Sequence, residues 1–114
     1  MLTACLGEEL PAVHYLIGYS GDKVPLVPYF TFGTQELADA IKQSIGNYNA
    51  LLLGNHGMLA IGTTIENAFD CAESIEFVAE IYLKCKSIGE PKILNQEQIK
   101  EVIRRFSTYR NSEK

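Results

Sequence analysis

A single histidine lies at the centre of the stretch best suited to chemistry. His56 stands between Asn55 and Gly57, and this polar tripeptide separates two apolar runs, 51–53 and 58–61. Each run has the length of a short buried strand. A rigid turn that presents an imidazole is well suited to hold a metal ion. The same pattern is also typical of an ordinary tight turn, because Asn-x-Gly favours one without any chemical role for the histidine.

Composition limits the classes of function. The chain has 114 residues, which corresponds to one domain at most, or to part of one. It is 46% hydrophobic and 21% charged, which indicates a folded globular protein rather than a disordered one. The net charge of −4 and the absence of a basic patch argue against nucleic acid as a partner.

Membrane and redox signals point to the cytoplasm. No apolar run reaches the roughly 18 residues of a membrane span, so we expect no membrane partner. The first ten residues hold two glutamates and no lysine or arginine, which does not fit a signal peptide. Cys5, Cys71 and Cys85 are odd in number and widely spaced, so we expect reduced thiols and a cytoplasmic location.

Around His56, the sequence predicts two strands and three longer helices. We expect strands over 50–55 and 58–62, and helices over 34–46 and 64–88, because their apolar residues repeat with the matching periods. Thr34 and the Thr63-to-Glu66 capping pattern mark the starts of these two helices. Asn95 begins a last helix, whose arginines we expect to pair with the helix end or to stay solvated.

The first third of the chain gives weaker signals. Residues 1–11 predict the tail of a helix that ends near Gly7. The apolar run 12–17 predicts a strand, on which neighbouring side chains point to opposite faces. Residues 24–29 contain two prolines and predict an edge strand or a loop, since proline cannot donate to a central ladder.

Taken together, four stretches make the sequence resemble the class II aldolase/adducin family, with the fuculose-phosphate aldolase branch nearest. They are Leu-Pro-Ala-Val-His-Tyr at 10–15, Pro-Tyr-Phe-Thr-Phe-Gly-Thr-Gln-Glu-Leu at 28–37, Leu-Leu-Leu-Gly-Asn-His-Gly at 51–57 and Phe-Ser-Thr-Tyr at 106–109. The resemblance implies an α/β fold, with a mostly antiparallel sheet flanked by helices. It also implies that residues 1–114 are an incomplete, C-terminal part of the domain, because the family's phosphate-binding segment, catalytic acid and His-x-His-Pro ligand pair have no counterpart here.

The resemblance assigns roles to four residues. His56 matches the third zinc-binding histidine of the family, which makes Zn²⁺ the implied cofactor. Tyr15 matches a catalytic tyrosine that reaches into the neighbouring subunit's site and protonates the departing aldehyde oxygen. Phe32 and Tyr109 match residues that flank the substrate. No role is assigned to His14, and without the resemblance Tyr15 would be read as a partly buried tyrosine.

The implied function is zinc-dependent cleavage of L-fuculose 1-phosphate, or of a similar sugar phosphate, to dihydroxyacetone phosphate and an aldehyde, in a homotetramer. We expect residues 1–114 alone to be inactive, because most of the active site is missing. A second hypothesis is a non-catalytic, adducin-like interaction domain. A third is an enzyme from a further branch of the family, namely a ribulose-phosphate epimerase, a rhamnulose-phosphate aldolase or a methylthioribulose-phosphate dehydratase.

Overall fold

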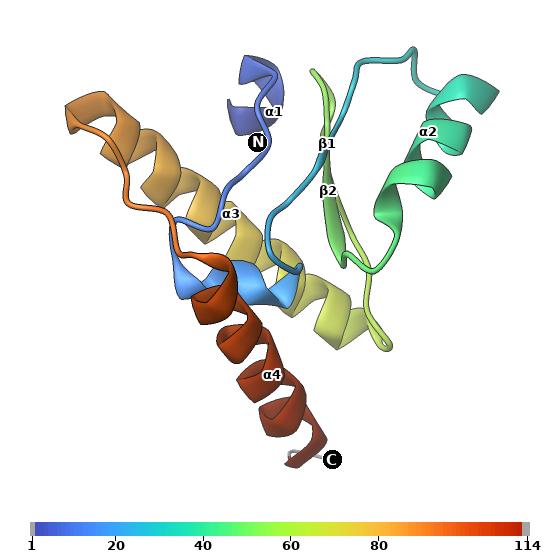
Figure 1. Ribbon diagram of the computed structural model, residues 1–114. Coiled ribbons are helices and arrows are strands. Elements are labelled where there is room, and N and C mark those ends of the chain that lie inside the picture. Colours follow the sequence, from blue (N-terminus) through green and yellow to red (C-terminus); the bar gives the residue numbers. More distant parts are fainter. Residues whose placement is uncertain (1, 113–114) are drawn as a thin grey trace.

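A three-stranded sheet packs between helices in the computed structural model, which describes residues 2–112 (Figure 1). The strand order is β1-β2-β3, in which β1 pairs with β2 in parallel and β2 pairs with β3 in antiparallel orientation. The bounds in chain order are α1 (Leu2–Leu6), the 3₁₀ helix η1 (Tyr15–Tyr19), β1 (Leu26–Val27), α2 (Gln35–Ile45), β2 (Ala50–Leu53), β3 (Gly57–Ala60), α3 (Ile65–Ile88) and α4 (Gln96–Ser112).

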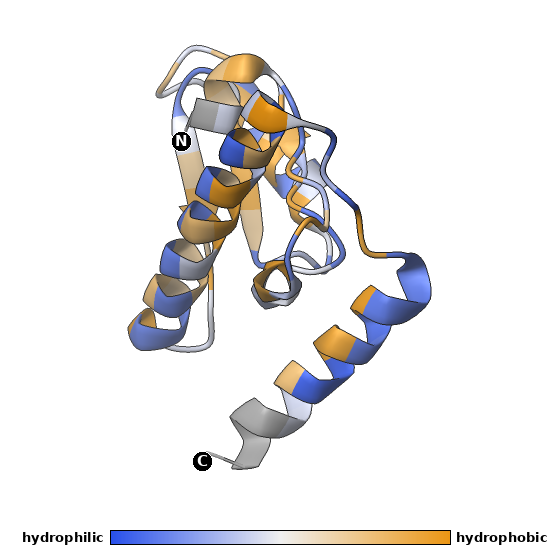
Figure 2. Cartoon of the chain, turned by 90° about the vertical axis from the view of Figure 1, so that its left-hand side faces the viewer, coloured by the Kyte–Doolittle hydropathy of each residue, from blue (hydrophilic) through white to orange (hydrophobic). Residues whose placement is uncertain are grey.

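Strand β2 lies at the centre of the molecule, and all four of its residues are buried. Alternate side chains of a strand point to opposite faces of the sheet. Ala50 and Leu52 belong to the core shared with α3, whereas Leu51 and Leu53 pack with Leu37 of α2. The two helices therefore cover opposite faces of the sheet, and Figure 2 shows its strands mostly in the hydrophobic colours.

The predicted α/β fold, its helices and the strand pair around His56 are confirmed, with small shifts at the ends of the elements. Thr34 caps α2 by accepting from the Leu37 amide at 3.4 Å. Helix α3 begins one residue later than the Thr63 capping pattern indicates, because the hydroxyl of Thr64 accepts the Asn67 amide at 3.0 Å. Asn95 and Gln98 cap each other's backbone amides at the start of α4. The antiparallel pair of β2 and β3 is the longer one in the sheet, and α2 connects β1 to β2 as a short parallel pair.

The predicted strand over 12–17 is wrong. This segment bends after Pro11 and then forms η1, where the amide of Ser20 donates to the Ile17 carbonyl at 2.9 Å. Its apolar side chains pack against helices instead of joining a ladder, since Ala12 and Ile17 belong to the core cluster of α3 and α4. Residues 24–29 form an edge strand as expected, but only Leu26–Val27 pair with β2. Over residues 2–112, no helix is both long and apolar enough to cross a membrane.

Tyr48, just before β2, is expected to ionise at a higher pH than an ordinary tyrosine. Its hydroxyl donates to a carboxylate oxygen of Asp22 at 2.8 Å, and partial burial together with this carboxylate raises the pKa of Tyr48 to about 12. The raised pKa favours the neutral phenol in the folded state. The stability that it contributes is therefore complete below pH 10, the ordinary value, and is lost as the pH rises toward 12.

Absorbance titration of the tyrosines checks this expectation. A late step should be present in the protein and absent from Tyr48→Phe, and Asp22→Asn should shift the step to lower pH. A single transition at the ordinary tyrosine pKa, unchanged by Tyr48→Phe, would contradict it.

Candidate functional site

The turn between β2 and β3 presents His56 to solvent from a rigid support. The His56 amide donates to the Leu53 carbonyl at 3.0 Å, and Asn55 takes a left-handed conformation with φ of 55°. The amide of Asn55 donates to the Ala4 carbonyl of α1 at 3.1 Å. Gly54 lies against β1, donating to the Val27 carbonyl at 2.8 Å. The turn is thus fixed on two sides, while the His56 side chain itself is exposed.

Tyr15 begins η1, and its ring is held by other aromatic side chains. His14 caps η1, since its Nδ1 accepts the Leu16 amide at 3.2 Å. The His14 ring stacks on Tyr15 with centroids 4.8 Å apart and meets Phe77 of α3 edge-on at 5.7 Å. The predicted opposite orientation of His14 and Tyr15 is therefore wrong, because neither residue lies on a strand. Tyr15 nevertheless stays 53% exposed, so its phenol is accessible.

His56 and Tyr15 lie at different ends of the fold. The end of η1 is tied to the residue before β2, since Asn49 donates from Nδ2 to the Tyr19 carbonyl at 3.0 Å. His56 follows the other end of β2, and the four residues of this strand span roughly 13 Å. Figure 1 agrees, with the β2–β3 turn beside α1 and η1 between α3 and α4. One subunit therefore does not bring these two side chains together.

Of the two residues predicted to flank the substrate, the structure describes the side chain of Phe32 but not that of Tyr109. Phe32 lies in the loop between β1 and α2 and is 78% exposed. Tyr109 belongs to α4, but its side chain lies outside the described residues. One turn earlier on α4, Phe106 contacts Tyr19 with ring centroids 4.8 Å apart. Sequence patterns do not predict the aromatic contacts of Tyr19 and Phe106, because these contacts join segments almost ninety residues apart.

Gly18 allows α4 to approach η1. A Cβ atom on Gly18 would lie 2.8 Å from ring carbons of Phe106 and from a methyl carbon of Val102. We expect Gly18→Ala to destabilise the fold by about 1–3 kcal/mol, because this contact has no room for a methyl group. Gly89→Ala is the matched control, since nothing lies within 4 Å of its Cβ position. Urea denaturation of both variants measures the difference, and equal stabilities would contradict the packing described.

The described residues do not form a metal site by themselves. No group of three or more histidine, cysteine, aspartate or glutamate side chains gathers at one point within this part of the chain. His56 offers one imidazole, whereas a catalytic zinc site usually has three protein ligands. Cys5 is exposed and Cys85 is partly buried, whereas Cys71 is buried with its thiol directed to the carbonyls of Tyr19 and Asn49. The described residues can therefore supply one ligand to a metal site, but not a complete set of ligands.

Comparison with known proteins identifies the family. Residues 1–83 match the family described as the class II aldolase and adducin N-terminal domain. A 5-deoxy-D-ribulose 1-phosphate aldolase from Bacillus thuringiensis is 48% identical over 106 residues, covering 93% of this chain and 50% of that protein. An L-fuculose phosphate aldolase from Escherichia coli is 37% identical over 106 residues, covering 91% of this chain and 49% of that protein.

Solved structures agree with this result. An L-fuculose 1-phosphate aldolase superposes with a TM-score of 0.91 at 40% identity, covering 93% of this chain and 50% of that one. The chain thus spans about half the length of the relatives that it matches. The family match over most of the chain and the agreement in fold lead to one conclusion: the chain belongs to the class II aldolase and adducin family.

Proposed function

We propose that residues 1–114 form part of a metal-dependent aldolase that cleaves a phosphorylated ketose to dihydroxyacetone phosphate and an aldehyde. The relatives with similar sequences are named as aldolases of fuculose, deoxyribulose and methylthioribulose phosphates, which supports cleavage over epimerisation or dehydration. L-Fuculose 1-phosphate and 5-deoxyribulose 1-phosphate are the two substrates that we favour.

The placement of His56 and Tyr15 is the observation that carries this proposal. His56 offers an exposed imidazole from a fixed turn, which suits one ligand of a zinc ion; the other ligands then come from residues other than the described ones. Tyr15 offers an accessible phenol, which can donate its proton to the leaving alkoxide. Because the two lie at opposite ends of β2, we place Tyr15 at the site of a neighbouring subunit in a homotetramer. The odd number and wide spacing of the three cysteines in the sequence support a cytoplasmic location for this enzyme.

The chain alone is expected to show no aldolase activity. It offers one imidazole of the proposed site, and zinc held by one exposed ligand does not reach useful occupancy. The purified chain is incubated with zinc and L-fuculose 1-phosphate, and any dihydroxyacetone phosphate released is reduced enzymatically with NADH. A complete family aldolase at the same concentration is the positive control. Zinc-dependent cleavage by the chain alone would refute the proposal that residues 1–114 carry only part of the active site.

A non-catalytic role in protein interaction is the second candidate. The family description includes adducin, and no three-ligand cluster exists within residues 3–108. The two candidate functions can be distinguished in a longer protein that contains residues 1–114. The enzyme proposal expects cleavage that requires His56, whereas an interaction domain would show none.

A further inference from the structure

His14, to which the sequence assigns no role, lies beside the proposed proton donor. It immediately precedes η1, and its half-buried ring contacts both Tyr15 and Phe77 of α3. Its backbone and side chain together contact the first three residues of η1. His14 is therefore in a position to determine where the Tyr15 phenol points.

The first set of contacts fixes the backbone of η1. The Leu16 amide donates to Nδ1 of His14 at 3.2 Å, and the Ile17 amide donates to the His14 carbonyl at 3.1 Å. The two amides that follow Tyr15 are thus bonded to the residue before it. A 3₁₀ helix has poorer hydrogen-bond geometry than an α-helix, so we expect loss of this cap to loosen the turn that contains Tyr15.

The second set of contacts fixes the Tyr15 ring. The rings of His14 and Tyr15 are stacked, with centroids 4.8 Å apart and an angle of 27° between their planes. Phe77 meets the His14 ring edge-on at 5.7 Å, which ties this stack to α3. Because Tyr15 is 53% exposed, the stack restricts a side chain that would otherwise keep much of its rotational freedom.

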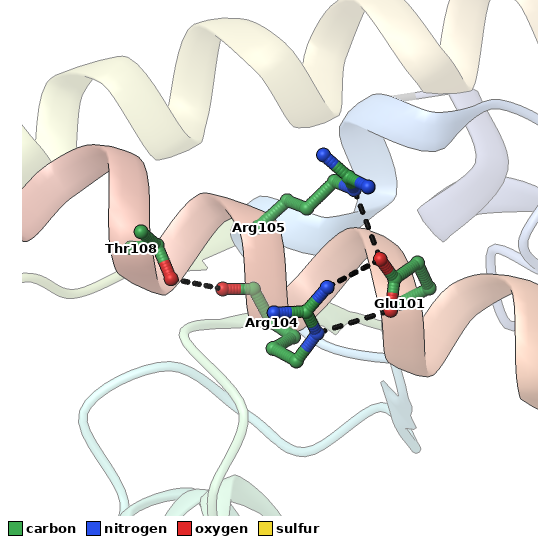
Figure 3. Close-up of polar contacts among 4 residues, drawn as sticks. All are labelled: Glu101, Arg104, Arg105 and Thr108. Carbon is green, nitrogen blue, oxygen red and sulfur yellow. Dashed lines mark hydrogen bonds and ion pairs between the residues drawn. The ribbon is translucent and has the colours of Figure 1, made fainter.

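Helix α4 bounds Tyr15 on another side. Arg104 and Arg105 line a groove together with Tyr15, but both donate to Glu101 on their own helix (Figure 3). Their side chains are also mostly exposed, as the sequence predicts. Phe106 contacts Tyr15 with centroids 6.1 Å apart and planes tilted by 46°. The stacked ring of His14 is thus the closer of these two aromatic contacts.

A histidine combines two properties at this position. Serine, threonine, aspartate and asparagine are the preferred residues before a helix because they supply an acceptor, but they have no ring to stack. Because Nδ1 of His14 accepts the Leu16 amide, it carries no proton, and the imidazole proton lies on Nε2. One side chain therefore caps η1 and stacks on its first residue.

We propose that His14 is a positioning residue for Tyr15, whose Nδ1 fixes the first turn of η1 and whose ring aligns the phenol. This inference rests on the proposed function, in which Tyr15 protonates the leaving alkoxide. His14 acts through Tyr15, so it changes the rate of cleavage but not the binding of zinc or substrate.

Kinetics of the full-length enzyme that contains residues 1–114 test this role. We expect His14→Ala to lower kcat by about 10–100-fold, since a misplacement of about 1 Å costs up to about 10²-fold. KM and bound zinc should each stay within about twofold, because the proton is transferred only in the transition state. His14→Asn keeps the acceptor and His14→Phe keeps the ring, so each should recover kcat by about threefold or more over His14→Ala.

Two comparisons separate positioning from a general loss of stability. Thr64→Ala is the matched control, because it removes the side-chain cap of α3, which accepts the Asn67 amide at 3.0 Å, and leaves the cap of η1 in place. Its kcat should stay within about twofold of that of the unchanged enzyme. His14→Ala combined with Tyr15→Phe should be at most about twofold slower than Tyr15→Phe alone, because no hydroxyl is left to position.

The outcomes distinguish this inference from the proposed function. Multiplied losses in the double variant, or a kcat for His14→Ala as high as that for Thr64→Ala, would overturn the positioning role and leave the proposed function intact. An unchanged kcat in Tyr15→Phe would instead overturn the proposed function, and the positioning role with it. If His14→Ala does not fold, the same comparison in both backgrounds is made with His14→Asn, which keeps the cap and loses the stack.

Discussion

His56→Ala is expected to abolish both metal retention and sugar-phosphate cleavage in a full-length aldolase that contains residues 1–114. The proposed zinc site takes one imidazole from this segment, and losing a direct ligand costs more than the 10–100-fold typical of residues that only support a ligand. We therefore expect kcat/KM to fall by more than about 100-fold. Bound zinc per subunit and kcat/KM are measured on the same preparations.

His14→Asn is the control for this experiment. It removes the other histidine of the segment, and a carboxamide oxygen at this position can still accept the Leu16 amide that Nδ1 of His14 accepts now. Zinc content should stay at the level of the unchanged enzyme. His56→Ala with full zinc content and full activity would show that the β2–β3 turn has no part in the metal site.

The environment of His56 is predictable from sequence because local patterns determine it. Two apolar runs on either side of Asn55 and Gly57 give two buried strands and a turn, and the structure forms them at Ala50–Leu53 and Gly57–Ala60. The contact that fixes the turn is not predictable in this way. The Asn55 amide donates to the Ala4 carbonyl, and nothing in either local sequence indicates that α1 lies beside this turn.

The segment that contains Tyr15 shows where the pattern of apolar residues does not predict the secondary structure. A short apolar run fits a buried strand and a segment covered by helices equally well. The side chain of His14 decides between them here, since its Nδ1 caps the first turn of η1. Gly18 is also informative once the structure is known, because it is the position where α4 needs close approach.

Tyr15→Phe is expected to lower kcat of the full-length enzyme by about 10²–10⁴-fold, the usual contribution of a positioned proton donor. The substitution removes the phenol hydroxyl and keeps the ring. The stacking on His14 and the contact with Phe106 are therefore preserved, and stability should change little. Zinc content should be unchanged, since Tyr15 lies at the other end of β2 from His56. A loss of activity that follows a loss of zinc would contradict this role.

Mixed oligomers test most directly whether Tyr15 and His56 serve sites on different subunits. Inactive Tyr15→Phe and His56→Ala full-length subunits are unfolded, mixed in equal amounts and refolded together, and zinc-dependent cleavage is assayed against each variant refolded alone. If Tyr15 acts across the interface, some sites receive an intact His56 from one subunit and an intact Tyr15 from its neighbour, and activity returns. If mixed oligomers form, as shown by differently tagged subunits purifying together, and activity stays at the level of the separate variants, the proposed sharing of the site is wrong.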